Sequence, residues 1–289
     1  MAVKWKAIRF MVIGMLAFAC LNFMVKYLEH LSAFQLVFFR AAGTLFITLP
    51  VIYYRKLNPF GNKKKLLLFR ALTGFTSLLF FFIALKMMPL GTCVALRYLA
   101  PIFAAIFALI MLKEQVKMIQ WLFFIISFSG VLVIKGFDPA LSMLGVTLIL
   151  ISGALSGLVI VIIRKIGFDD HPIVIVNYFM VVSAVLGLFG SLSDWTTPIG
   201  LEWIYLMLLG FFGFIGQYFM TKAVQLETTD VIAPIKYIEI PFTILIGMTF
   251  FGETYGWISI LGFTLIISGL IFNILFKSKL RLRPRKLKT

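Results

Sequence analysis

The chain has 289 residues, of which 62% are apolar and 13% are charged, and its formal net charge is +16. Soluble domains are about half apolar and about a quarter charged, so this composition excludes a soluble core and indicates a protein that lies in lipid. The positive charge lies in short loops between apolar stretches, where it orients membrane spans, and this placement argues against a nucleic acid partner.

Ten apolar stretches follow one another along the chain, and each has roughly the 20 residues that a helix needs to cross a bilayer. They lie near 8–28, 34–54, 66–86, 92–112, 118–135, 142–164, 173–193, 201–222, 230–251 and 257–276. The connections are short, and the sequence contains no phosphate-binding loop that ends in Gly-Lys-Ser/Thr, which excludes an ATP-driven pump encoded on this chain alone. The sequence therefore predicts an all-α membrane protein with ten transmembrane helices.

The first of these stretches shares features with a secretory signal peptide. Lys4, Lys6 and Arg9 precede it, and Ala17-Phe18-Ala19 matches a small-residue cleavage site. The apolar run continues to about Tyr27, however, which is too long for the apolar region of a signal peptide. Cleavage would also delete the first element of an internal repeat, so we expect an uncleaved first span.

That internal repeat has an offset of 139 residues and runs through the chain without a gap. Equivalent pairs include Gly14 and Gly153, Gly74 and Gly213, Tyr98 and Tyr237, and Ser129-Gly130 and Ser268-Gly269. The predicted units are a first five-helix repeat at 1–139, a second at 140–278 and a basic tail at 279–289. Because each repeat holds an odd number of spans, the second must enter the membrane inverted, as in many secondary transporters with a site at the midplane.

The Lys and Arg residues of the loops alternate sharply between the two sides of the predicted membrane. Almost all of them lie on the side of the two termini, whereas the opposite side has Lys26, Lys86 and Lys135. The positive-inside rule therefore predicts cytoplasmic termini in a bacterial inner membrane. We expect the basic tail to keep the C-terminus inside, and binding of the tail to anionic membrane lipid is the alternative.

Four basic residues lie inside predicted spans, namely Arg40, Arg70, Arg97 and Lys236. Arg70 is one turn into its span, so its side chain is expected to snorkel to the cytoplasmic surface. Arg40 lies deeper, where a charge costs at least about 2–3 kcal/mol, so it is expected to face a polar interior. A structural pairing role and a substrate role fit Arg40 equally well.

Arg97 and Lys236 occupy equivalent positions in the two repeats, and each is followed by a tyrosine. A two-fold axis in the membrane plane would bring the two cations near each other, and a proline beside each would open the helix there. Glu239 has no acidic counterpart in the first repeat, and it lies three residues after Lys236. It is therefore either the ion-pair partner of Lys236 or a carboxylate that exchanges a proton during transport. The resulting positive cavity would receive a substrate with a carboxylate or another anionic group.

Uncharged polar residues within the spans would either hydrogen-bond a substrate or hold neighbouring helices together. They are Asn22, Gln35, Tyr98, Asn177, Tyr178, Gln217 and Tyr237. The histidines and cysteines form no cluster with metal-ligand spacing, so neither a metal nor another cofactor is expected. The residues predicted to bind substrate are Asn22, Arg40, Arg97, Tyr98, Gln217, Lys236, Tyr237 and Glu239.

Several short motifs at corresponding places in the spans resemble those of one transporter family. They are Phe38-Phe39-Arg40, Ala100-Pro101, Gln217 before Ala223, Ala233-Pro234 with Tyr237, and Phe251-Gly252-Glu253. Together with the ten spans and the repeat, they make the chain similar to the EamA family of the drug/metabolite transporter superfamily. The runs from Lys26-Tyr27 to Tyr53-Tyr54 and at Tyr237-Ile238-Glu239 are similar to members that carry S-adenosylmethionine, whereas other members export amino acids and related metabolites.

The resemblance implies movement of a small metabolite without a bound cofactor. It also implies that the first four spans of each repeat line the substrate path. The fifth and tenth spans would then serve as scaffold or as the contacts of a homodimer. The pattern departs from the family at Ile240-Pro241, which affects where Glu239 points.

Three classes of function compete for a chain of this kind. A secondary transporter of a small organic metabolite, amino acid-like or carboxylate-bearing and working by alternating access, is favoured, with S-adenosylmethionine uptake or exchange as the alternative within the family. A membrane-embedded enzyme would need a base or an activated nucleophile near the membrane surface, and the loop residues Asp169-Asp170-His171 are the nearest arrangement. A channel or a structural subunit is the third class, and a channel would more naturally have a symmetric polar filter. We therefore expect a transporter and not an enzyme.

Overall fold

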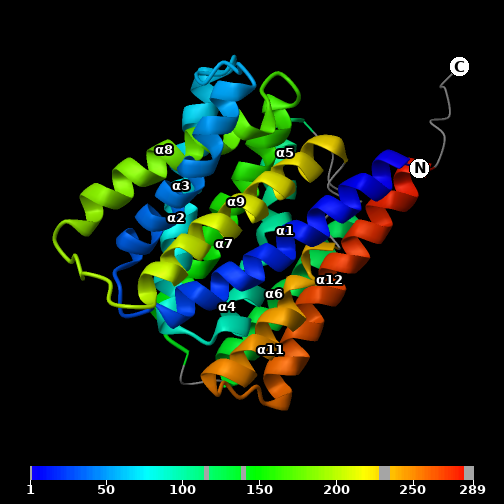
Figure 1. Cartoon of the computed structure of the whole chain (residues 1–289). Coiled ribbons are helices and arrows are strands. Elements are labelled where there is room, and N and C mark those ends of the chain that lie inside the picture. Colours follow the sequence, from blue (N-terminus) through cyan, green and yellow to red (C-terminus); the bar gives the residue numbers. More distant parts are fainter. Residues whose placement is uncertain (1, 114–116, 138–140, 228–234, 283–289) are drawn as a thin grey trace, which may run out of the picture.

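The computed structural model describes residues 2–113, 117–137, 141–227 and 235–282, and every regular element within them is an α-helix (Figure 1). The helices are α1 (Ala2–Tyr27), α2 (Ala33–Tyr54), α3 (Lys64–Met87), α4 (Leu90–Arg97), α5 (Ala100–Met111), α6 (Met118–Phe137), α7 (Met143–Ile166), α8 (Pro172–Ser191), α9 (Glu202–Leu226), α11 (Glu239–Phe251) and α12 (Trp257–Leu282). The sequence motif Ala233-Pro234 and the last part of the basic tail, 283–289, lie outside the described residues.

Seven stretches of the described residues are long and apolar enough to cross a membrane. They are Trp5–Tyr27, Ala33–Tyr54, Lys64–Met87, Leu90–Met111, Met143–Ile166, Pro172–Ser191 and Glu202–Leu226. The other three predicted spans coincide with shorter apolar stretches, Met118–Ile134, Glu239–Phe251 and Trp257–Asn273. The protein is thus a multi-pass, all-helical membrane protein, and seven of the ten predicted spans reach full length within the described residues.

The helices pack mainly between the two halves of the chain and not within them. The first helix, α1, lies along α9, and α3 lies along α7 (Figure 1). At the 139-residue offset α7 is the equivalent of α1 and α9 is the equivalent of α3, so these two contacts are the same contact with the halves exchanged. The helix α2 packs on its own equivalent α8, and α6 packs on its own equivalent α12. Central helices from both halves therefore enclose one shared interior.

Two helices end and restart at equivalent places inside the bundle. Tyr98 and Leu99 form a turn between α4 and α5, and Tyr237 and Ile238 form a turn directly before α11. Pro101 sits in the first turn of α5, where its missing N–H loses no intrahelical hydrogen bond. The predicted span 92–112 is thus one apolar stretch, Leu90–Met111, that a turn interrupts directly before Pro101, where the proline is predicted to open the helix.

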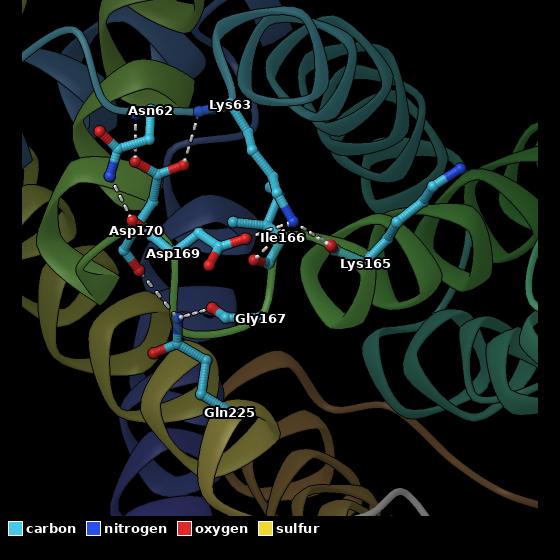
Figure 2. Close-up of polar contacts among 8 residues, drawn as sticks. All are labelled: Asn62, Lys63, Lys165, Ile166, Gly167, Asp169, Asp170 and Gln225. Carbon is cyan, nitrogen blue, oxygen red and sulfur yellow. Dashed lines mark hydrogen bonds and ion pairs between the residues drawn. The ribbon is translucent and has the colours of Figure 1, made fainter.

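A network of polar contacts ties the loop before α3 to the loop after α7, and we call it the Lys63 tie (Figure 2). The Asp170 carboxylate accepts hydrogen bonds from the backbone N–H groups of Asn62 at 2.5 Å and Lys63 at 3.1 Å. The Lys63 ammonium forms an ion pair with Asp169 at 2.5 Å. From α9, the Gln225 amide donates to the carbonyl of Asp170 at 3.1 Å. The tie thus joins three segments from both halves at one end of the bundle.

At the other end of the bundle, one side-chain contact lies at positions that the repeat relates to Lys63 and Asp169, and we call it the His30 tie. The His30 imidazole lies 2.9 Å from the Glu202 carboxylate. At the 139-residue offset His30 corresponds to Asp169 and Glu202 corresponds to Lys63, so the two ties are related by the repeat with the charges reversed. Gln35 adds to this end, because its side-chain amide exchanges two hydrogen bonds with the backbone of Thr196.

The close packing of α7 on α5 depends on Gly157. A Cβ atom added there would lie 2.6 Å from the carbonyl oxygen of Ala100 and 2.7 Å from the backbone nitrogen of Ala104. Both neighbours are backbone atoms, which cannot turn aside as a side chain can. The approach of α7 to the broken helix therefore requires a residue without a side chain at this position.

We predict that Gly157→Val lowers the apparent Tm of the detergent-solubilised protein by about 5 °C, because overpacking costs about 1–3 kcal/mol. Gly256→Ala is the matched control, since nothing lies within 4 Å of a Cβ added there. Thermal unfolding of the purified variants measures the difference. Equal Tm values for the two variants would contradict the packing argument.

Candidate functional site

A cavity lies at the centre of the bundle, where the two helix breaks meet. Its empty volume, including the part open to solvent, is about 910 Å³. Its lining comes from both halves of the chain, including α1 to α3 and the α4–α5 break from the first half and α7 to α9 and the start of α11 from the second. The cavity therefore lies between the halves, as the repeat predicts for a transport site.

Four basic side chains line this cavity, and they are Arg40, Arg70, Arg97 and Lys236. Arg40 and Arg70 are almost fully buried, with 3% and 1% of their surface exposed, whereas Arg97 and Lys236 are partly buried. Within the described part of the chain, no carboxylate lies within 4.0 Å of any of the four. Buried charges without partners are costly, so the cavity is set up to attract an anion.

Arg70 corrects the expectation from the sequence, because its side chain does not reach the cytoplasmic surface. It turns into the bundle, and its guanidinium carbon lies 4.1 Å from the centre of the Phe179 ring. The reason is the packing of α3 on α8, which turns this face of α3 inward. The signal that sequence reasoning missed is Gly74, which lies one turn after Arg70 on the same face and leaves room for the long side chain.

The two helix breaks lie against each other, as the repeat predicts. The Tyr98 and Tyr237 rings meet edge to face, with centroids 5.5 Å apart and an interplanar angle of 76°. Both Arg97 and Lys236 reach the cavity beside them, and the Arg97 guanidinium lies 4.0 Å from the Phe81 ring centre. Tyr237 itself stands behind the lining, and its buried hydroxyl has no hydrogen-bond partner among the described residues.

Glu239 is held by hydrogen bonds from the other half of the chain and not by Lys236. Its carboxylate accepts from the side-chain amide of Asn22 at 2.7 Å and from the hydroxyl of Tyr98. Of the two roles predicted for Glu239, the ion pair with Lys236 does not form within 4.0 Å among the described residues, because the turn at Tyr237 and Ile238 interrupts the helix between them. Proton exchange by Glu239 stays a prediction. Glu239 instead opens α11, where the helix dipole favours a carboxylate.

The remaining predicted polar residues divide into two groups. Gln217 lines the cavity and donates to Thr221 one turn later in α9, at 3.4 Å. Gln35 and Asn177 act between elements instead, since Gln35 bonds Thr196 and Asn177 accepts from Thr48 at 3.0 Å. Tyr178 is outside the lining.

Sequence reasoning missed two further polar lining residues, Ser77 and Ser156. Their hydroxyl oxygens lie 2.8 Å apart across α3 and α7. Single serines in apolar helices carry no pattern that marks them in advance.

Comparison with known proteins gives the family of this chain. The EamA-like transporter family matches it twice, at residues 5–136 and at residues 143–275. The chain belongs to this family. Its two matches divide the chain close to the boundary at residue 139 that the internal repeat gives.

Curated relatives of this EamA-like transporter are themselves named as transporters or solute carriers. The chain is 29% identical over 262 residues to a pseudopaline exporter from Pseudomonas aeruginosa, which covers 89% of this chain and 91% of the relative. It is 27% identical over 270 residues to an S-adenosylmethionine uptake transporter from Rickettsia prowazekii, covering 89% of this chain and 88% of the relative. It is also 26% identical to human solute carrier family 35 member G1, covering 84% and 72%.

A solved crystal structure has the same fold as this EamA-like transporter. The two superpose with a TM-score of 0.71 at 16% sequence identity, and the match covers 96% of this chain and 98% of the other. At this identity the likeness concerns the fold alone. The arrangement of helices around the central cavity is therefore not peculiar to this chain.

We predict that Asn22 and Glu239 are energetically coupled. Asn22→Leu or Glu239→Leu alone leaves a buried partner with a lost hydrogen bond, so each should lower the apparent Tm, whereas the double variant should lose less than the sum. Unfolding measurements on the four proteins should give a coupling energy of about 1 kcal/mol.

The matched control combines Asn22→Leu with Thr48→Val, because Thr48 bonds Asn177 in a separate contact. The effects of that control pair should add. Additive effects of the Asn22 and Glu239 substitutions as well would show that their contact contributes nothing.

Proposed function

We propose that this protein is a secondary transporter that moves a small organic metabolite with at least one carboxylate, or another anionic group, across a bacterial inner membrane by alternating access. The observation that carries the proposal is the central cavity, where four basic side chains face one carboxylate and have no ion-pair partner among the described residues.

An amino acid-like substrate fits the polarity of the lining. Its carboxylate would bind the partly buried cations Arg97 and Lys236, and its ammonium group would approach Glu239. S-adenosylmethionine is the alternative, because it combines an amino acid group with a sulfonium cation and because a relative is named for its uptake. The aromatic rings of Phe81 and Phe179 at the wall would favour the organic part of either substrate.

We also propose that ten spans form two inverted repeats with both termini in the cytoplasm. The two family matches, the exchanged contacts of α1 with α9 and of α3 with α7, and the equivalent helix breaks support the inverted repeat. The excess of Lys and Arg in the loops on the side of the termini supports the orientation. In this orientation the Lys63 tie is cytoplasmic and the His30 tie faces outward.

The two ties would then close the two ends of the substrate path. Each joins the segment before the third helix of one half to the segment after the first helix of the other, so rocking of the halves would break one tie while the other stays closed. The Lys63 tie holds several hydrogen bonds and an ion pair, whereas the His30 tie has one side-chain contact between its two residues. At the outward end Gln35 adds two hydrogen bonds to the backbone of Thr196.

Beside the Lys63 tie, His171 adds no charge near neutral pH. Burial, together with the charges of Arg55 and Lys222, lowers the pKa of His171. Its neutral Nδ1 accepts a hydrogen bond from the backbone N–H of Ile173 at 3.2 Å and so begins α8.

The first prediction concerns the cations beside the helix breaks. Arg97→Ala and Lys236→Ala should each reduce uptake by reconstituted protein at least tenfold, because each removes a charge that binds the anionic group. The readout is uptake of radiolabelled S-adenosylmethionine, glutamate and succinate into proteoliposomes, with thermal unfolding to show that the variants fold. Arg55→Ala, at an exposed arginine, is the control and should keep full uptake. Normal uptake by both cavity variants would reject the proposed site.

A further inference from the structure

The two most deeply buried cations of the cavity have hydrogen-bond donors with nothing to bind. Among the described residues, the Nε atom of Arg40 and the Nε and Nη1 atoms of Arg70 have no partner. Both side chains line the cavity and are at least 97% buried. An unpaired buried donor costs about 1–3 kcal/mol, and more when it is charged, so an arrangement that keeps three of them is expected to have a ligand.

Both guanidinium groups face the ring of Phe179. The guanidinium carbon of Arg70 lies 4.1 Å from the ring centre, and that of Arg40 lies 5.9 Å from it and also 5.9 Å from the ring of Phe18. Contact with the ring faces offsets part of the cost of burying the charge, but it satisfies no N–H donor. Phe179 is the repeat equivalent of Arg40, so the pair of arginines exists because the second repeat has an aromatic ring where the first has a cation.

Two equivalent glycines provide the space in which these arginines lie. A Cβ atom at Gly213 would be 3.0 Å from the Cγ and 3.1 Å from the Nε of Arg40. A Cβ atom at Gly74 would be 2.8 Å from the Nη1 of Arg70. Any larger residue at either position would push a guanidinium group out of its place. The glycines at these two positions thus form the space that the arginine pair occupies.

Arg40 and Arg70 come from α2 and α3 and rest on Phe179 of α8, whereas Arg97 ends α4 and rests on Phe81. The charge of Arg40 also interacts with that of Arg97. The two pairs line the same cavity. Among the described residues, no carboxylate lies within 4.0 Å of either pair. One monovalent anion at Arg97 and Lys236 would leave the donors of Arg40 and Arg70 unpaired.

We propose that Arg40 and Arg70 form a second anion subsite, which binds a second acidic group of the same substrate. This inference rests on the proposed function and narrows it to metabolites with two acidic groups, such as dicarboxylates or acidic amino acid derivatives. Guanidinium groups suit this role because their parallel N–H donors match the two oxygens of a carboxylate. Two acidic groups would offset two of the four basic side chains, and Glu239 opposes a third.

The test uses the full-length protein in proteoliposomes and pairs of acids that differ by one carboxylate. L-glutamate is compared with L-glutamine, and succinate with butyrate, in ligand-induced thermal shift and in competition for uptake. The unaltered protein should prefer the member with two carboxylates by about tenfold or more. Arg70→Gln and Arg40→Gln should each reduce that preference to less than about twofold while retaining the weaker binding of the acid with one carboxylate.

A subsite role and a structural role for Arg70 predict opposite changes in the apparent Tm of the protein without ligand. Removing an unpaired buried charge should leave the apparent Tm of Arg70→Gln unchanged or raise it, whereas loss of a structural contact should lower it. Arg70→Lys keeps the charge without the paired donors and should fold, bind the acid with one carboxylate and have a reduced preference for the diacid. The exposed Arg55→Gln is the matched control and should change nothing.

The possible outcomes separate this subsite from the proposed function. Equal binding of both members of each pair, with Arg97→Ala still defective, would overturn the second subsite and leave the function in place. If Arg70→Gln loses a response to chloride that the unaltered protein has, while the diacid preference stays intact, the arginines bind an inorganic anion and the proposal is overturned. Absence of binding by every acid tested would reject the anionic substrate and the subsite together.

Discussion

Positive charge buried at the centre of a membrane protein is the constraint on which the rest of this structure depends. Four basic side chains enter one cavity, and Glu239 is the one carboxylate that lines it within the described part of the chain. In lipid such charges cannot be relieved by moving a helix outward, so they must face water, aromatic rings or a ligand. Two of the guanidinium groups rest closely on Phe81 and Phe179, and the glycines beside Arg40 and Arg70 keep the space that they need. The charge therefore determines the residues around it.

The two helix breaks bring backbone groups and the Glu239 carboxylate to the cavity. A continuous helix at 90–111 would leave no free backbone groups near the cavity, whereas the turn at Tyr98 and Leu99 places the start of α5 there. The equivalent turn places Glu239 at the start of α11, within reach of Asn22 and Tyr98 from the first half. A carboxylate at this point links the halves, so a change in its bonding would be felt by both. Residues of the site thus also connect the two halves.

The sequence predicted which residues would meet but not how they would bond. Equivalent positions in the two repeats identified Arg97 with Lys236 and Tyr98 with Tyr237, and these tyrosines do touch. The partner of Glu239 was missed because helical spacing was assumed across a turn. Arg70 was missed because depth along a span says nothing about which way its face points, and α8 turns that face inward. Ser77 and Ser156 meet across helices that are far apart in the sequence.

The sequence by itself determined the solvent, the helical class, the family and the position of the cations along the chain. Composition and periodicity suffice for these, because a chain in lipid must satisfy its backbone within helices. Only the tertiary structure decided the partners, since hydrogen bonds such as that from Asn22 to Glu239 join residues 217 positions apart. The same holds for the related ties of Lys63 and His30 at opposite ends of the bundle. Which charges are paired and which stay free is a property of packing, because packing alone sets the distances between helices.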